Sequence, residues 1–270
     1  MNSETKLRYQ GYSKTPSLFL EKSPIDIDMY EIVNPNEQMD SDNLESSNPR
    51  LGKLVEEFVF YDLKQKSEIK WISENIQIQD NKLTIGELDT LFYQNHQPIH
   101  LEIVYKFYLY DSLHTYNDPL EYWIGPNRKD TLVYKLHKLK QKQFPLLHDF
   151  RTKSYLDNYG LEVNTIKQKL CFKAQLFLPF NDLEVDVKLL NKDCVTGFYV
   201  SIDKIEILKS YQFYIPKKLD WLVTPHNNVE WLSLEAAKHT IKTFTNNKRS
   251  PMCWIKDETS QLQKCFITYW

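Results

Sequence analysis

The sequence predicts an α/β (α+β) protein in which a mixed sheet is flanked by helices and followed by a β-rich carboxyl-terminal part. Two segments carry apolar residues at helical spacing, and runs in which apolar and polar residues alternate lie between them. Further strand-like runs follow Pro145. Of the 270 residues, 41% are hydrophobic and 14% aromatic, so the chain can bury a large core.

Two amphipathic helices are expected in the first half of the chain. The first begins after Pro49, where apolar residues recur at the spacing i, i+3, i+4, i+7 and i+8. These residues are Leu51, Leu54, Val55, Phe58, Val59 and Leu63. Gly125-Pro126-Asn127 then breaks the chain before the second helix, which we expect at about residues 130–143.

Three strands are expected between these helices, at residues 75–79, 83–94 and 99–110. Asp80-Asn81-Lys82 predicts a turn after the first strand. The loop between the second and third strands is short, which predicts an antiparallel hairpin.

The second half of the chain predicts mostly strands. At residues 170–178 apolar residues alternate with Lys173 and Gln175, which indicates a strand with one exposed face. One helix is expected at about residues 234–244. The other expected strands lie at residues 183–190, 195–208, 211–215, 252–255 and 266–270.

We therefore divide the chain into an irregular amino-terminal segment at 1–50, a core at 51–149 and a β-rich region at 150–270. The first segment is expected to be irregular because residues 21–50 hold eight acidic and two basic side chains together with three prolines.

Composition excludes several classes of protein. There are 34 Lys and Arg against 36 Asp and Glu, so a globally basic nucleic-acid coat or a polybasic membrane binder is excluded. No GxGxxG or GxxxxGK[ST] motif is present, which argues against dinucleotide and P-loop sites. No long uncharged apolar window and no CxxC pair occur, so we expect no membrane span, reduced thiols and a cytoplasmic location.

Charged side chains lie within the predicted strands. Glu87 and Asp89 project from one side of their strand, and Glu102 and Lys106 share one face of the next, because side-chain direction alternates. Charges inside apolar strands are costly to bury unless they are paired or bind a metal. Carboxylates suit Mg²⁺ or Mn²⁺, and a nearby lysine could stabilise the charge that develops on a phosphoryl group. The alternative is a simple Glu–Lys ion pair at a solvated strand edge.

The order of these residues resembles the nuclease core of the PD-(D/E)XK phosphodiesterase superfamily, with its restriction-endonuclease-like mixed sheet, over about residues 51–149. The resemblance rests on the stretch from Gly52 to Glu56, on Gly86-Glu87-Leu88-Asp89, and on Glu102 and Lys106. The chain also resembles the bacterial domain-of-unknown-function family 1853 from residue 51 onward. The motifs of that resemblance are Leu51-Gly52, Gly86-Glu87-Leu88-Asp89, Val104-Tyr105-Lys106-Phe107-Tyr108-Leu109, Gly125-Pro126-Asn127 with Asp130, and Gly197-Phe198-Tyr199.

The superfamily resemblance implies roles for individual residues. Asp89 would bind the metal, Glu56 would be the helix carboxylate and Lys106 the catalytic lysine. Val104 occupies the position two before Lys106 where the superfamily usually has an acid. The second metal carboxylate would therefore be Glu102, which would join the catalytic set, or Glu87.

The second helix supplies a basic surface. Residues 128–142 hold six Lys or Arg and one acid, and Lys135, Lys138 and Lys142 can share one helix face. With Arg128, these lysines could bind nucleic-acid phosphates. Alternatively, they only keep the surface soluble.

The sequence thus predicts a Mg²⁺- or Mn²⁺-dependent phosphodiesterase that acts on nucleic acid and is not bound to a membrane. The alternative is a catalytically inactive nuclease-like scaffold that serves as a nucleic-acid or protein interaction module, and Val104 at the acidic position favours that alternative.

Overall fold

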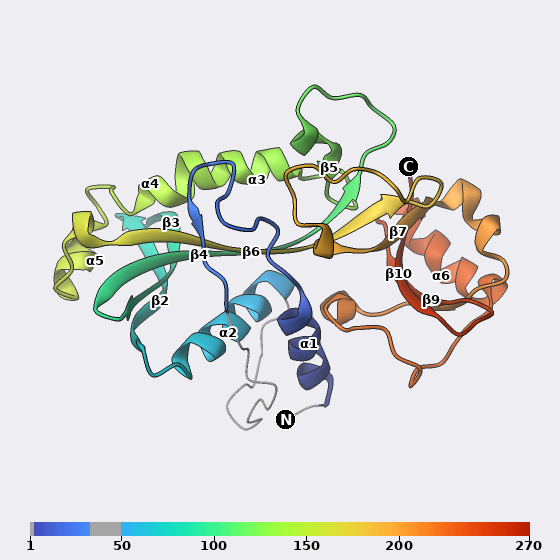
Figure 1. The fold of residues 1–270 in the computed structure, drawn as a ribbon, viewed down its shortest axis with the longest axis horizontal. Coiled ribbons are helices and arrows are strands. Elements are labelled where there is room, and N and C mark those ends of the chain that lie inside the picture. The colour runs from blue at the N-terminus through green and yellow to red at the C-terminus, as the bar shows by residue number, and fades with distance from the viewer. Residues whose placement is uncertain (1–2, 33–49) are drawn as a thin grey trace.

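A ten-stranded mixed sheet runs through the computed structural model, which describes residues 3–32 and 50–270 (Figure 1). Its strands are β1 (Asp28–Met29), β2 (Ile69–Asp80), β3 (Leu83–Gln94), β4 (Gln97–Tyr110), β5 (Trp123–Ile124), β6 (Lys167–Pro179), β7 (Val195–Ser201), β8 (Gln212–Tyr214), β9 (Met252–Lys256) and β10 (Leu262–Thr268). The main path of the sheet is β2-β3-β4-β6-β7-β10-β9-β8, while β1 pairs with β6 and β5 pairs with β4.

The centre of the sheet is parallel and its two ends are antiparallel. Strand β6 pairs in parallel with β4, from Ile99↔Lys167 to Leu109↔Phe177, and with β1 and β7 on its other side. Strands β7 and β10 are also parallel, whereas β2-β3-β4 and β10-β9-β8 are antiparallel. Strands from before and after residue 150 therefore pair within one continuous sheet.

Helices cover both faces of the sheet (Figure 1). They are α1 (Ser3–Lys14), α2 (Leu51–Lys64), α3 (Leu132–Lys138), α4 (Phe144–Leu146), α5 (Lys153–Asn158) and α6 (Leu234–Asn246). Helices α1 and α2 lie on one face, and α3 and α4 lie on the opposite face. A π turn, η3 (Leu139–Gln143), joins α3 to α4. The short 3-10 helices are η2 (Pro119–Tyr122), η4 (Val163–Thr165), η5 (Lys192–Cys194), η6 (Ile202–Leu208) and η7 (Lys218–Trp221).

Strand β4 separates two apolar cores because its side chains alternate. Leu101, Ile103 and Tyr105 pack with α1 and α2, whereas Val104 and Tyr108 pack with α3. Two further cores lie under α6 and under α4 with α5. No helix among the described residues is both long and apolar enough to cross a lipid bilayer.

The elements of the first half follow their sequence patterns closely. Helix α2, strand β3 and the β3–β4 hairpin are confirmed, and β2 extends beyond the expected residues 75–79 on both sides. The helix expected at 130–143 is instead divided into α3, the π turn η3 and the start of α4 at Phe144.

The second half differs from prediction in three places. Residues 183–190 form turns rather than a strand, and the strand expected at 195–208 ends at Ser201 and continues as η6. Strand β6 has no solvent-exposed face, since Lys173 and Gln175 are buried. Neighbouring strands and helices enclose β6, and Gln175 Nε2 donates a hydrogen bond of 2.8 Å to the hydroxyl of Tyr105.

Helix α1 lies inside the segment for which the sequence predicts no regular structure. The hydroxyls of Tyr9 and Tyr12 donate hydrogen bonds to Asp62 on α2, and the Tyr12 bond measures 3.0 Å. Gly11 permits close packing, because a Cβ there would lie 2.0 Å from the carbonyl oxygen of Leu222. The acidic stretch at residues 33–49 lies outside the described residues.

Candidate metal centre and the adjoining basic cavity

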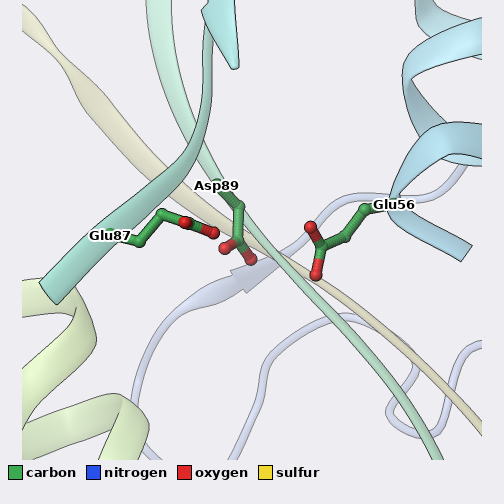
Figure 2. A group of neighbouring side chains, drawn as sticks. All are labelled: Glu56, Glu87 and Asp89. Carbon is green, nitrogen blue, oxygen red and sulfur yellow. The ribbon is translucent and has the colours of Figure 1, made fainter. Parts of the chain in front are cut away.

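Three acidic residues converge between α2 and β3. Figure 2 shows the carboxylates of Glu56, Glu87 and Asp89 pointing toward one another. One oxygen from each lies within 4.8 Å of the others. Because Mg²⁺ and Mn²⁺ prefer oxygen ligands, with Mg²⁺–oxygen distances near 2.0–2.1 Å, the three carboxylates are compatible with a divalent-cation site.

Asp89 lies where β3 and β4 stop pairing. The backbone register of the two strands runs from Gln94↔Gln97 to Thr90↔Leu101. Beyond that point, the amide of Ile103 donates a hydrogen bond of 2.8 Å to Asp89 Oδ2. The carboxylate thus accepts the amide of the neighbouring strand, which fixes the orientation of the Asp89 side chain.

Burial makes the carboxyl groups of Asp89 and Glu56 reluctant to ionise. Asp89 is 7% exposed, and its burial, together with the charge of Glu102, raises its pKa to about 7. Burial and then the charge of Asp89 raise the pKa of Glu56 to about 7. A bound cation would favour the charged forms of both groups.

Lys53 provides a positive charge at this cluster. Its Nζ lies 2.5 Å from Glu56 Oε2, 2.5 Å from Glu87 Oε1 and 2.9 Å from Asn75 Oδ1. Lys53 was not among the residues predicted from the sequence. The one available signal was its spacing, since residues three apart on a helix are neighbours and Lys53 precedes Glu56 by three.

Glu102 lies outside the group of three converging carboxylates, although its charge acts on Asp89. It is fully buried, and Glu102 Oε1 lies 3.1 Å from Nε2 of His100. Gln143 donates a hydrogen bond to Glu102 Oε2 and accepts one of 2.7 Å from Lys135 Nζ. Burial raises the pKa of Glu102 to about 7 and lowers the pKa of Lys135 to about 8, while the opposite charges of the two side chains act against both shifts. The structure thus connects Glu102 to Lys135 through Gln143, and it also leaves Glu102 close enough to Asp89 for their charges to interact.

Lys106 lies beside the loop that follows β5. Its Nζ forms an ion pair of 2.6 Å with Asp130 Oδ2. Gly125 makes room for this carboxylate, since a Cβ at position 125 would fall 1.9 Å from Asp130 Oδ1. The amide of Gly125 also donates a 2.8 Å hydrogen bond to the carbonyl of Asp130, so the loop holds Asp130 against Lys106.

A cavity of about 540 Å³ lies beside the carboxylate cluster. Glu56, Lys106, Asp130 and Lys135 all contribute to its wall. The remaining lining residues are Arg50, Leu51, Gly52, Ile103, Val104, Tyr105, Phe107, Pro126, Asn127, Lys129, Lys218 and Trp221. Glu56 therefore belongs both to the carboxylate cluster and to the cavity.

The four residues of the predicted nucleic-acid surface are placed differently from one another. Lys138 and Lys142 are exposed, whereas Lys135 turns inward toward Gln143. For Lys142 the π turn explains the difference, because one extra residue in a helix makes i+8, here Gln143, rather than i+7 return to the side of Lys135. Arg128 forms hydrogen bonds of 3.2 and 2.6 Å to the buried carboxylate of Asp111 and lies 4.6 Å from the ring of Trp270.

Several residues of the site were not singled out from the sequence. Lys129 and Lys218 reach the cavity from segments about 90 residues apart in the chain. Gln143 meets Glu102 through tertiary packing alone. Local spacing could not have identified these contacts, because each depends on how distant elements pack.

Fold and site together define a mixed α/β protein with a partly buried carboxylate cluster beside a lysine-lined cavity. The chain belongs to the family Domain of unknown function (DUF1853), whose model matches residues 29–265. The expected membership of this family is thereby confirmed. No curated protein and no solved structure matches the chain.

Proposed function

We propose that this protein is a Mg²⁺- or Mn²⁺-dependent phosphodiesterase that acts on nucleic acid. The observation that carries the proposal is the convergence of Glu56, Glu87 and Asp89 within 4.8 Å beside a cavity lined by lysines. Carboxylates suit a divalent cation, and ammonium groups suit the phosphates of the substrate.

The donor set fits a divalent cation on chemical grounds. All three groups are carboxylates. The pKa values of Glu56 and Asp89 are raised to about 7, and a bound cation would lower both values because it favours the charged carboxylates. Asp89, Glu56 and Glu87 would hold the ion, which would supply Lewis acidity toward a phosphoryl oxygen and acidify bound water.

The carboxylates would bind the metal, and the lysines of the cavity would bind the substrate. Lys106 and Lys135 would bind the phosphate and stabilise negative charge as it develops there. Glu102 would act as a positioning residue, since it fixes Gln143, and Gln143 in turn accepts a hydrogen bond from Lys135. The order of helix acid, strand acid and lysine on the next strand agrees with a PD-(D/E)XK-like core.

A second function is favoured by the position of Lys53. Its ammonium already bridges Glu56 and Glu87, so it could compensate these acids without any metal. In that case the protein would be an inactive nuclease-like scaffold that serves as a nucleic-acid or protein interaction module.

The test is to incubate the purified protein with single- and double-stranded DNA and RNA, in Mn²⁺, in Mg²⁺ and in EDTA. We expect cleavage in a divalent metal ion that is lost in EDTA and in Asp89→Asn. Asparagine keeps an acceptor for the amide of Ile103 but removes the charge. Glu258→Gln, an exposed change in the β9–β10 turn, serves as the control and should cleave normally.

Mn²⁺ titration calorimetry separates the two functions. Metal binding that disappears in Asp89→Asn supports the phosphodiesterase. Absence of both cleavage and metal binding would remove the enzyme proposal and leave the interaction module.

A further inference from the structure

The cavity beside the acidic cluster carries more positive than negative side chains. Four lysines line it, whereas its acids are Glu56 and Asp130. The lysines are Lys106, Lys129, Lys135 and Lys218, contributed by β4, the loop after β5, α3 and η7. A concave surface on which charges of one sign are in excess concentrates ligands of the opposite sign.

Three of these lysines have no acidic partner. Lys106 pairs with Asp130, but within the described ranges Lys129, Lys135 and Lys218 form no ion pair within 4.0 Å. Lys135 Nζ donates to the neutral amide of Gln143, and Lys218 Nζ lies 4.1 Å from the ring centre of Trp221. Lys129 and Lys218 are exposed at the cavity and Lys135 is half-buried, so an anion that enters the cavity can contact all three ammonium groups without first breaking an ion pair.

The side chain of Lys135 also shows the effect of burial. Withdrawal from water lowers the pKa of Lys135 to about 8, although the charges of Glu102 and Asp89 act against this shift. A bound anion would raise the pKa of Lys135 again, because it favours the charged form of the amine.

The size of the cavity restricts the ligand. Its volume of about 540 Å³ is that of a small-molecule site, which spans roughly 300–1,000 Å³, and it suits about one nucleotide rather than a duplex. Part of the wall is apolar, with Tyr105, Phe107 and Trp221. A sugar or base could therefore pack beside the phosphate.

We propose that this cavity binds the terminal phosphate monoester of a single nucleic-acid strand. A phosphate monoester carries close to two negative charges at neutral pH, which suits several unpaired ammonium groups better than the single charge of an internal diester. Glu56 belongs to both the cavity and the carboxylate cluster, so the end of the strand would lie next to the proposed metal centre. The identity of the polymer rests on the proposed function.

The experiment is fluorescence anisotropy in EDTA, where no cleavage occurs. Single-stranded DNA oligonucleotides of one sequence carry a 5′-phosphate, a 3′-phosphate or no terminal phosphate. We expect one phosphorylated end to bind about tenfold tighter than the unphosphorylated strand, as charge-assisted hydrogen bonds of this kind predict.

Two variants test the cavity itself. Lys218→Gln and Lys129→Gln should each reduce the preference for the phosphorylated end, and Lys129 is exposed, so its replacement does not disturb folding. Lys242→Gln, an exposed change on α6, is the control and should keep the full preference.

Equal affinity for all three oligonucleotides would overturn the proposal. Displacement by AMP at the same concentration as the phosphorylated strand would overturn the assignment to a strand end and favour a free nucleotide. End preference without metal-dependent cleavage would refute the phosphodiesterase but support this inference. Cleavage without end preference would support the phosphodiesterase and refute the binding of a strand end in this cavity.

Discussion

The ammonium nitrogen of Lys53, on helix α2, lies 2.5 Å from a carboxylate oxygen of Glu87, which is 34 residues away on strand β3. The same nitrogen is equally close to Glu56. Lys53 therefore compensates two of the three acids that would hold a metal ion, and a bound metal would compete with the ammonium for the same oxygens.

Replacement of Lys53 by methionine tests this competition. We expect Lys53→Met to bind Mn²⁺ more tightly than wild type in calorimetry. Without metal, the variant should lose about 1 kcal/mol of unfolding free energy, because the pair is partly exposed. Lys82→Met, in the exposed β2–β3 turn, is the matched control. Unchanged Mn²⁺ affinity would show that Lys53 does not compete.

The raised pKa of Asp89 makes its contribution to stability depend on pH. Its pKa is about 7 in the folded protein against 3.8 ordinarily, so folding takes up a proton between these values and Asp89 destabilises the fold as pH rises. The difference in unfolding free energy between Asp89→Asn and wild type should therefore grow by about 1 kcal/mol in favour of the variant as the pH rises from 6 to 8 in EDTA. The comparison of variant with wild type cancels groups that do not interact with Asp89, such as Lys264, whose lowered pKa acts in the opposite direction.

Metal binding should show the complementary dependence. A cation must displace the proton of Asp89, so Mn²⁺ affinity should be about tenfold weaker at pH 6 than at pH 8 for each proton displaced. Calorimetry in buffers of different ionisation enthalpy would also detect the released proton. An affinity independent of pH would mean that Asp89 is not protonated before binding.

Gln143 connects two charged groups and should matter for stability. In Gln143→Leu, the buried carboxylate of Glu102 loses one of its hydrogen-bond donors and Lys135 loses its acceptor. We expect a loss of about 1–3 kcal/mol of unfolding free energy in urea denaturation. Gln141→Leu, on the exposed side of the same π turn, should change stability little. Equal effects of the two changes would disprove the connection.

Arg128 is expected to stabilise the fold through Asp111. Burial alone would raise the pKa of Asp111, but hydrogen bonds from Arg128 and Tyr116 keep it below its ordinary value. Arg128→Ala leaves this fully buried carboxylate without its main partner and should cost about 3 kcal/mol. Arg128→Lys retains the charge but not the two parallel bonds, so its stability should be intermediate. Thermal unfolding of both variants above pH 5 tests this.

The local elements could be predicted where the sequence pattern decides the structure. Helix α2 and the β3–β4 hairpin carry strong periodicity, and both form as expected. Helix α1 was missed because its buried side chains include Tyr9 and Tyr12 rather than an aliphatic stripe. Strand β6 buries Lys173, which donates to the carbonyl of Thr15, and no local pattern shows that a lysine will find such an acceptor.

The candidate site was predictable only within each strand. Alternation correctly places Glu87 and Asp89 on one side of β3, and Glu102 with Lys106 on one face of β4. Alternation does not show which face α2 covers, and that choice brings Glu56 to Asp89 and directs Glu102 toward His100. The π turn also inserts one extra residue into the basic helix, so the side chains after it lie on a different face from the one that regular helical spacing predicts.

The parallel pairing of β4 with β6 has a consequence for work with fragments. A shortened protein that ends at residue 149 would lack β6, and β4 would present unpaired amides and carbonyls from Ile99 to Leu109. Exposed edges of this length recruit other chains, so such a fragment should self-associate rather than yield a soluble catalytic piece.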